Sequence, residues 1–203
     1  RFGELSIEIL LLSNRRDDGT LVPPDDPLMT LLAGNEGWHT DSSFKRLAAK
    51  ASILSAREVP AEGGETEWAD MRAAYDALDS DRRERLAGLS AHHSLEYSQS
   101  KVGGTATDTR SGLAALTYLN AGSAPSAGPA PAVGAASPEG GARSDPRRPL
   151  VKVHPVTGRP ALFIGRHAYG IPGLSPAESE RLLTDLVEAA CQRLAGSART
   201  VVV

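Results

Sequence analysis

The chain of 203 residues contains a single cysteine, Cys191, which excludes a disulfide framework and predicts a reducing, cytoplasmic setting. No apolar run approaches the roughly 18 residues of a membrane-spanning helix. No block of basic residues stands out, and the formal net charge is −3. Neither nucleic acid nor a membrane is therefore an expected partner. The first residues lack a methionine and do not resemble a signal peptide, so we expect the natural N-terminus to be missing.

The hydrophobic content of 40% is that of an ordinary globular protein, and the length suits a single domain over residues 1–203. Residues 103–149 are predicted to be an insertion in this domain. Its second half, residues 120–149, contains six of the chain's 14 prolines and is rich in Ala and Gly. Such a composition buries too little apolar surface to offset the entropy of ordering, which predicts a disordered loop.

Periodicity predicts strands that alternate with a few amphipathic helices. Asp70 is a good N-cap for a helix with its apolar stripe at residues 71–78, and Ser80 is the expected cap of a short helix ending at Leu86. Ser175 and Glu178 form a capping box ahead of a helix with a clear apolar stripe at residues 182–190. The predicted strands are residues 6–12, 51–59, 65–68, 150–153 and 161–164, of which the last two form a hairpin around a turn at 155–158.

The segment Asn35 to Phe44 contains His39 and Asp41, two residues apart. On an extended strand both side chains would point to one face, so an imidazole nitrogen and a carboxylate oxygen would converge. These are two of the three ligands in the facial triad of non-haem Fe(II) oxygenases. On its own the pattern is weak, because a His and an Asp that only hydrogen-bond to each other at a strand end would look the same.

Several further motifs occur with this pair in one order, and together they are much more specific than any one of them. With them the chain resembles the Fe(II)/2-oxoglutarate-dependent dioxygenases related to taurine dioxygenase and 2,4-dichlorophenoxyacetate dioxygenase. The sequence of the motif Trp38–Phe44 is closer to the aryloxyalkanoate-degrading branch than to the taurine branch. The matching stretches are Trp38–Phe44 (Trp-His-Thr-Asp-Ser-Ser-Phe), Gly63–Met71, Ala74–Leu78, His93–Ser94, His154–Arg159 and Ala161–Phe163.

The resemblance implies a mainly β fold with flanking helices (α+β), built on a double-stranded β-helix or jelly roll. It implies that His39 and Asp41 bind Fe(II), and that Thr66, after 24 intervening residues, donates to a carboxylate of 2-oxoglutarate. The implied reaction consumes O₂ and 2-oxoglutarate and releases succinate and CO₂. It hydroxylates a small organic acid of the aryloxyalkanoate or sulfonate kind. Without the resemblance, Thr66 reads equally well as a strand residue after a Gly-Gly turn.

The resemblance also places three residues near the substrate: Asn35, Ser98 and His167. For Asn35 a turn residue between glycines is an equal alternative. The adjacent His92 and His93 cannot both face one site on an extended chain, so one of them is expected in the core or behind the site. His154 opens the predicted hairpin turn and is expected to be structural.

The distal half of the family's site, a third ligand His and an Arg for 2-oxoglutarate, has no counterpart after the last helix. The resemblance therefore predicts a jelly roll incomplete at both ends. It leaves the alternative of an inactive homologue, truncated or frameshifted, with negligible turnover. His154 or His167 as a substitute third ligand is the less favoured idea. Self-association into a homo-oligomer is left open.

Overall fold

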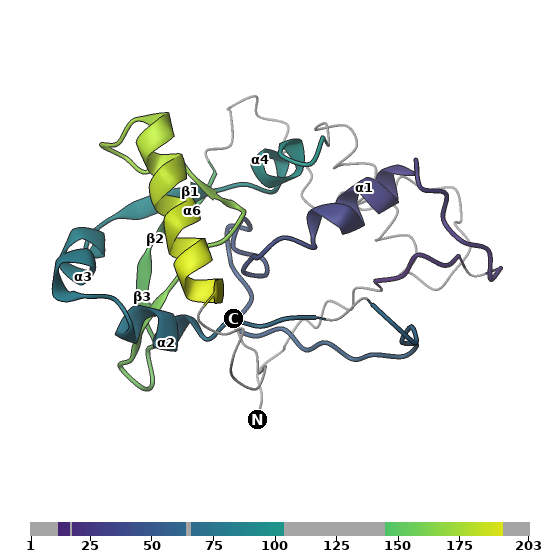
Figure 1. The fold of residues 1–203 in the computed structure, drawn as a ribbon, viewed down its shortest axis with the longest axis horizontal. Coiled ribbons are helices and arrows are strands. Elements are labelled where there is room, and N and C mark those ends of the chain that lie inside the picture. The colour runs from purple at the N-terminus through teal and green to yellow at the C-terminus, as the bar shows by residue number, and fades with distance from the viewer. Residues whose placement is uncertain (1–11, 17, 64–65, 104–144, 193–203) are drawn as a thin grey trace. The chain divides into compact units, whose positions relative to one another are not determined.

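The structure, a computed structural model, describes residues 12–16, 18–63, 66–103 and 145–192. The chain divides into two compact units: residues 1–36 with 98–143, and residues 37–97 with 144–203. Figure 1 follows the chain from purple at the N-terminus to yellow at the C-terminus. In the described residues no helix is both long and apolar enough to cross a bilayer.

In the first unit the main element is helix α1, Pro27–Gly34. Asp26 caps it by accepting a hydrogen bond from the Leu28 amide, and proline occupies the first helical position, where its missing N–H costs nothing. Ahead of α1 the chain turns back on itself: Arg15 and Leu21 are bridged, and Gly19 between them has a φ of +84°. Helix α1 was not predicted, although Asp26-Pro27 is a typical helix start.

In the second unit strand β1, Ser90–His93, is the centre of a three-stranded antiparallel sheet between β2, Arg147–Pro149, and β5, Ala168–Tyr169. Strands β3, Val151–Val153, and β4, Pro160–Leu162, form a separate antiparallel pair. The predicted hairpin is therefore confirmed. His154 has the structural role expected of it, because its Nδ1 accepts hydrogen bonds from the amides of Val156 and Thr157.

Helices cover these strands on one side. The 17-residue helix α6, Pro176–Gln192, packs on β5, and α2, Met71–Asp76, packs on β4 and α6 (Figure 1). Helix α3, Ser80–Leu86, is capped by Asp79 and not by Ser80, and α4, Leu95–Ser100, was not predicted. Ten buried residues form the core of this unit: Leu78, Leu86, Ala91, Leu150, Leu162, Ile164, Ala168, Ile171, Leu183 and Leu186.

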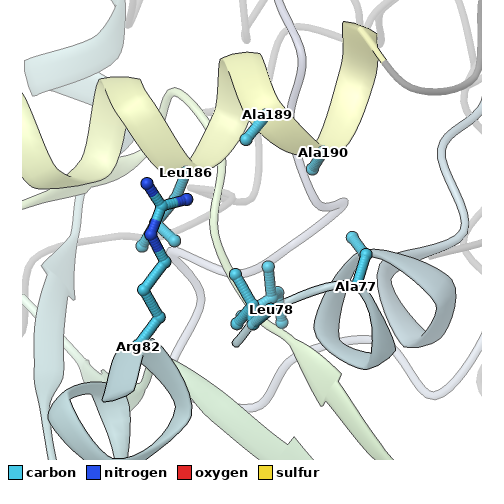
Figure 2. A pocket seen from close by; sticks show the side chains of 8 residues that line it. Ala77, Leu78, Arg82, Leu186, Ala189 and Ala190 are labelled. Atoms are coloured by element: carbon cyan, nitrogen blue, oxygen red, sulfur yellow. The ribbon is translucent and has the colours of Figure 1, made fainter. Parts of the chain in front are cut away.

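The seam between α6 and α2 is nearly full. Ala77, Leu78, Leu186 and Ala190 face one another there around a cavity of about 10 Å³ (Figure 2). Such a cavity has room for about one water molecule at most. The seam therefore acts as a packed core and is not a binding site.

Two predicted strands are wrong in the described residues. Residues 51–59 are irregular and exposed throughout, and residues 66–68 are irregular as well. Ile53, for example, is 95% exposed, so its side chain is not packed in a core. An apolar run becomes a strand only when a neighbouring strand satisfies its backbone groups, and these segments have no such neighbour among the described residues. The strand predicted at 6–12 lies outside the described residues, except for an irregular Leu12.

The balance of elements differs from the mainly β prediction. Strands with flanking helices are present, but in the described part of the chain helices hold more residues than strands. Most of the predicted insertion 103–149 lies outside the described residues. The predicted loop 120–149 overlaps β2 at its end, where Arg147–Pro149 pair with β1. Its disorder and the single-domain prediction stay predictions.

The capping box of α6 is confirmed and provides a stability test. The Glu178 amide donates to Ser175 Oγ at 3.3 Å, and the Ser175 amide donates to Glu178 Oε2 at 2.9 Å. We expect Ser175→Ala to lower the free energy of unfolding by about 1 kcal/mol. Ser80→Ala is the matched control and should change it by less than about 0.5 kcal/mol, because Asp79 caps α3. Urea denaturation followed by circular dichroism measures both; equal losses would contradict the assignment.

Candidate metal centre

His39 and Asp41 converge as predicted, although not on a strand. His39 lies in an irregular segment and Asp41 begins a turn over residues 41–44. The distance from His39 Nε2 to Asp41 Oδ1 is 3.2 Å. Two ligands held about 2.1 Å from one metal ion at right angles are about 3 Å apart. The pair therefore has the spacing of two adjacent ligands of a single ion.

Hydrogen bonding prepares His39 for this role. Its Nδ1 lies 2.8 Å from the Gly37 carbonyl oxygen, so Nδ1 carries the proton in the neutral ring and donates it there. Nε2 is left with its lone pair directed toward Asp41. A ligating histidine whose other nitrogen donates to a backbone carbonyl is the usual arrangement in metal sites.

In the protein without metal, the hydrogen bond between His39 and Asp41 shifts the pKa values of both side chains. The hydrogen bond with Asp41 raises the pKa of His39 against the opposing effect of burial. The hydrogen bond with His39 lowers the pKa of Asp41, and a further hydrogen bond from Ser52 lowers it too. The carboxylate is therefore charged at neutral pH, which is the form that a metal ion binds.

The backbone of residues 164–166 supports the histidine side of the pair. Arg166 donates its amide to the Trp38 carbonyl oxygen at 2.8 Å, and Thr40 Oγ1 donates to the Ile164 carbonyl oxygen at 3.1 Å. Gly165 lies between these two contacts at φ +135°, and a Cβ atom there would be 2.9 Å from His39 Cα. Only glycine allows the two backbone segments, residues 38–40 and 164–166, to approach so closely.

His167, predicted to lie near the substrate, is in ring contact with His39. It is 2% exposed, and its ring packs edge-on against His39 and Phe44 with centroid separations of 5.6 and 5.0 Å. Burial lowers the pKa of His167 to about 3. The ring is therefore neutral at physiological pH and adds no charge next to the pair.

The predicted role of Thr66 stays a prediction. Thr66 is exposed, and in the described residues no hydrogen bond joins it to His39 or Asp41. Its neighbour Glu67 and the neighbour of His39, Trp38, do line one open pocket of about 270 Å³ with Cys191. Burial and Glu67 raise the pKa of the Cys191 thiol to about 11, which makes it a poor nucleophile and metal ligand at neutral pH.

The other two predicted substrate residues belong to the first compact unit, whereas the pair belongs to the second. Asn35 ends α1 and Ser98 is buried in α4, both in the first unit. The described residues contain no cluster of three or more His, Cys, Asp or Glu side chains around one point. His154 and His167 therefore do not form such a group with the pair. Of the two adjacent histidines, His93 is buried at 1% exposure and His92 is half-buried, as expected for opposite faces of β1.

Sequence reasoning missed two residues that organise this site, Gly165 and Arg148. Arg148, on β2, donates hydrogen bonds to the carbonyl oxygens of Ser43, Lys45 and Arg46, just after Asp41. Gly165 was visible as a glycine directly after a predicted strand, which is a signal for close backbone approach. Arg148 had no usable signal, because a single arginine in a Pro- and Arg-rich stretch looks like a solvated loop residue.

The donor set fits Fe(II). A neutral imidazole and a charged carboxylate are the ligand types of the facial triad, and their separation matches one ion. The second nitrogen of His39 already has an acceptor, so metal binding would not leave a buried donor unsatisfied. His39 and Asp41 are thus residues that could hold the metal.

Comparison with known proteins establishes the class. The taurine catabolism dioxygenase TauD, TfdA family matches residues 1–198, and the chain belongs to this family. It is 48% identical over 194 residues to the (S)-phenoxypropionate/alpha-ketoglutarate-dioxygenase of Sphingobium herbicidovorans, which covers 95% of this chain and 60% of the relative. It is 37% identical over 186 residues to the alpha-ketoglutarate-dependent 2,4-dichlorophenoxyacetate dioxygenase of Cupriavidus pinatubonensis, covering 92% and 55%.

Solved structures agree with the sequence relatives. The structure of AAD-2 in complex with Mn(II) and N-oxalylglycine aligns with a TM-score of 0.66 and 35% identity, over 88% of this chain and 56% of that one. The chain thus spans little more than half the length of the relatives it matches. The relatedness confirms the predicted family and its mixed helix-and-sheet fold.

Proposed function

We propose that the chain forms the part of an Fe(II)- and 2-oxoglutarate-dependent dioxygenase that supplies two metal ligands, His39 and Asp41. The observation that carries the proposal is the 3.2 Å separation of His39 Nε2 and Asp41 Oδ1, with Nδ1 already hydrogen-bonded to Gly37. In the whole protein we propose that the strands belong to a double-stranded β-helix, the jelly roll expected from the sequence.

When bound, iron and 2-oxoglutarate would supply the oxidation: the keto acid would be converted to succinate and CO₂, with one oxygen atom of O₂ entering succinate and the other a C–H bond of the substrate. The residues of this chain do the positioning. His39 and Asp41 fix the ion, and Thr66 donates its hydroxyl to a carboxylate of 2-oxoglutarate. The shared pocket of Trp38 and Glu67 supports this role for Thr66, because it brings the neighbours of Thr66 and His39 together.

The substrate we propose is a small organic acid, an aryloxyalkanoate in preference to a sulfonate. The relatives named for phenoxypropionate, at 48% and 44% identity, resemble the chain more closely than those named for sulfate esters, at 31%. The position of Arg166 favours an acidic substrate, because this half-buried, positively charged guanidinium lies near enough to His39 to oppose protonation of the imidazole. Asn35, Ser98 and His167 are the proposed substrate residues, and of these His167 is in ring contact with His39.

Metal binding tests the pair directly. We expect the chain to bind Mn(II), measured by the loss of the free-ion signal in electron paramagnetic resonance, and His39→Ala to weaken binding at least about 100-fold, because one of two ligands is gone. His154→Ala is the control, since it removes an exposed imidazole from the β3–β4 turn. Equal Mn(II) affinity in His39→Ala and in the unsubstituted chain would contradict the proposal.

Binding of the second cosubstrate is tested with N-oxalylglycine, which carries the two carboxylates of 2-oxoglutarate with an N–H in place of one methylene. We expect it to tighten Mn(II) binding, and Thr66→Val to remove much of this gain because the hydroxyl donor is lost. Succinate formation from 2-oxoglutarate with Fe(II) and phenoxypropionate distinguishes an active chain from an inactive homologue. The relatives give that alternative no support.

A further inference from the structure

The aspartate side of the pair differs from the histidine side in how it is fixed. Asp41 is 46% exposed in its side chain, so packing does not hold the carboxylate in place. Besides its hydrogen bonds with His39 and Ser52, its direction depends on the backbone of the turn at residues 41–44. That turn includes Ser42 at φ +56°, the one left-handed non-glycine residue among the described residues. A left-handed L-residue costs about 1–2 kcal/mol, so the turn needs an external support.

Arg148 provides that support. Its Nε donates to the Ser43 carbonyl oxygen at 3.2 Å, and its Nη2 donates to the carbonyl oxygens of Lys45 and of Arg46, the latter at 3.2 Å. Each of these acceptors lies within five residues of Asp41. The turn also closes on itself, through the Lys45 amide and the Ser42 carbonyl oxygen at 3.0 Å.

The backbone of Arg148 is itself fixed by the sheet. Arg148 lies opposite Ala91 in the pairing of β2 with β1, and Ala91 is fully buried in the core. The guanidinium therefore holds the turn at a fixed position relative to the sheet. A guanidinium suits this task because its donors form a rigid planar fork, whereas a lysine carries its donors on one freely rotating nitrogen.

We propose that Arg148 is a positioning residue for the metal centre: it fixes the turn that aims the Asp41 carboxylate at the ion held by His39. This rests on the proposed function, because it requires a metal ion at the pair. The described hydrogen bonds of Arg148 go to backbone carbonyl oxygens and not to His39 or Asp41. Partners of this kind, one step removed from the ligands, typically change metal affinity 10- to 100-fold when altered.

The test compares Arg148→Lys and Arg148→Ala with Arg159→Lys. Arg159 is the matched control, since its guanidinium bonds Asp76 at 2.8 Å on the surface and has no contact with residues 41–46 among those described. We expect Arg148→Lys to weaken Mn(II) binding about 10- to 100-fold and Arg159→Lys to leave it unchanged. Added methylguanidinium should restore part of the affinity of Arg148→Ala by refilling the site of the fork. If Arg148→Ala does not fold, Arg148→Lys, which keeps the stem and the charge, carries the test.

A second readout separates positioning from a general loss of stability. The visible absorption of bound Co(II) reports the arrangement of its ligands, and we expect it to shift in Arg148→Lys but not in Arg159→Lys. Unchanged affinity and an unchanged Co(II) spectrum in folded Arg148→Lys would overturn the proposal, while His39-dependent binding would keep the proposed function intact. Absence of His39-dependent binding in the unsubstituted chain would overturn both.

Discussion

Gly165→Ala is expected to destabilise the protein by about 2–6 kcal/mol and to abolish Mn(II) binding at the pair. Two costs add. The residue sits at φ +135°, a conformation that costs an L-residue about 1–3 kcal/mol. Its new methyl group would lie 2.9 Å from His39 Cα and 3.1 Å from the Trp38 carbonyl oxygen, and such overpacking typically costs a further 1–3 kcal/mol.

The displacement has a direction. The methyl group would push the His39 backbone away from residues 164–166, which would break the hydrogen bonds to Trp38 and Thr40. Nε2 would then no longer lie beside Asp41, so metal affinity should fall even in protein that stays folded.

Gly158→Ala separates strain from contact. Gly158 is also left-handed, at φ +66°, but a Cβ atom there would meet nothing within 4 Å. We expect it to cost about 1 kcal/mol and to leave Mn(II) affinity unchanged. Urea denaturation and a Mn(II) titration on both variants measure the difference. A Gly165→Ala protein that binds Mn(II) as tightly as Gly158→Ala would show that the close approach does not position His39.

Acid is expected to destabilise the protein through His93. This imidazole is 1% exposed, and its ring lies tilted against that of Phe163 with the centroids 5.6 Å apart. Neither of its ring nitrogens has a hydrogen-bond partner in the described residues. Burial, with Arg148 and Lys152 nearby, lowers its pKa to about 4 from 6.5. An uncharged ring in this position is tolerated, whereas a charged one would be buried without a counter-ion.

The direction of this pH dependence follows from which state, folded or unfolded, binds the proton at the higher pH. The unfolded chain protonates this histidine below pH 6.5 and the folded chain only near pH 4. Stability is therefore fully present above pH 6.5 and falls as the pH drops toward 4, by about 3 kcal/mol for this group. Below pH 4 both states are protonated, and this contribution to the pH dependence ends.

His93→Phe should remove that part of the acid sensitivity while keeping an aromatic ring against Phe163. The measurement is the free energy of unfolding by urea at pH 7.5 and at pH 4.5, for both proteins. The quantity compared is the loss between the two pH values, so a constant effect of the substitution cancels. His167 is shifted in the same direction and remains in both proteins, so some acid sensitivity should persist. An equal loss in the two proteins would contradict the assignment to His93.

The sequence predicted the parts of this molecule that depend on local chemistry. The cap at Asp70, the capping box at Ser175 and the β3–β4 hairpin are set by neighbouring residues, and all are confirmed. The convergence of His39 and Asp41 was predicted from a two-residue spacing and is also confirmed, although the strand invoked for it is absent.

The parts that failed depend on partners far along the chain. Residues 51–59 have the composition of a strand, but no described strand pairs with them. Arg148 and Gly165 support a turn and a histidine more than 100 residues earlier, and a single sequence does not show such contacts. The roles of Thr66, Asn35 and Ser98 remain predictions for the same reason, since they rest on the family resemblance and not on a local pattern.

The order of assembly follows from the long separation between the pair and its supports. Thr40 and Ile164, which are hydrogen-bonded, lie 124 positions apart, and Ser43 and Arg148 lie 105 apart. During synthesis His39 and Asp41 leave the ribosome long before the segments that hold them. Contacts at such range form slowly, because the chain must first lose the entropy of closing a long loop. The nascent chain should therefore acquire metal affinity late, in one step with the docking of residues 145–169 onto β1.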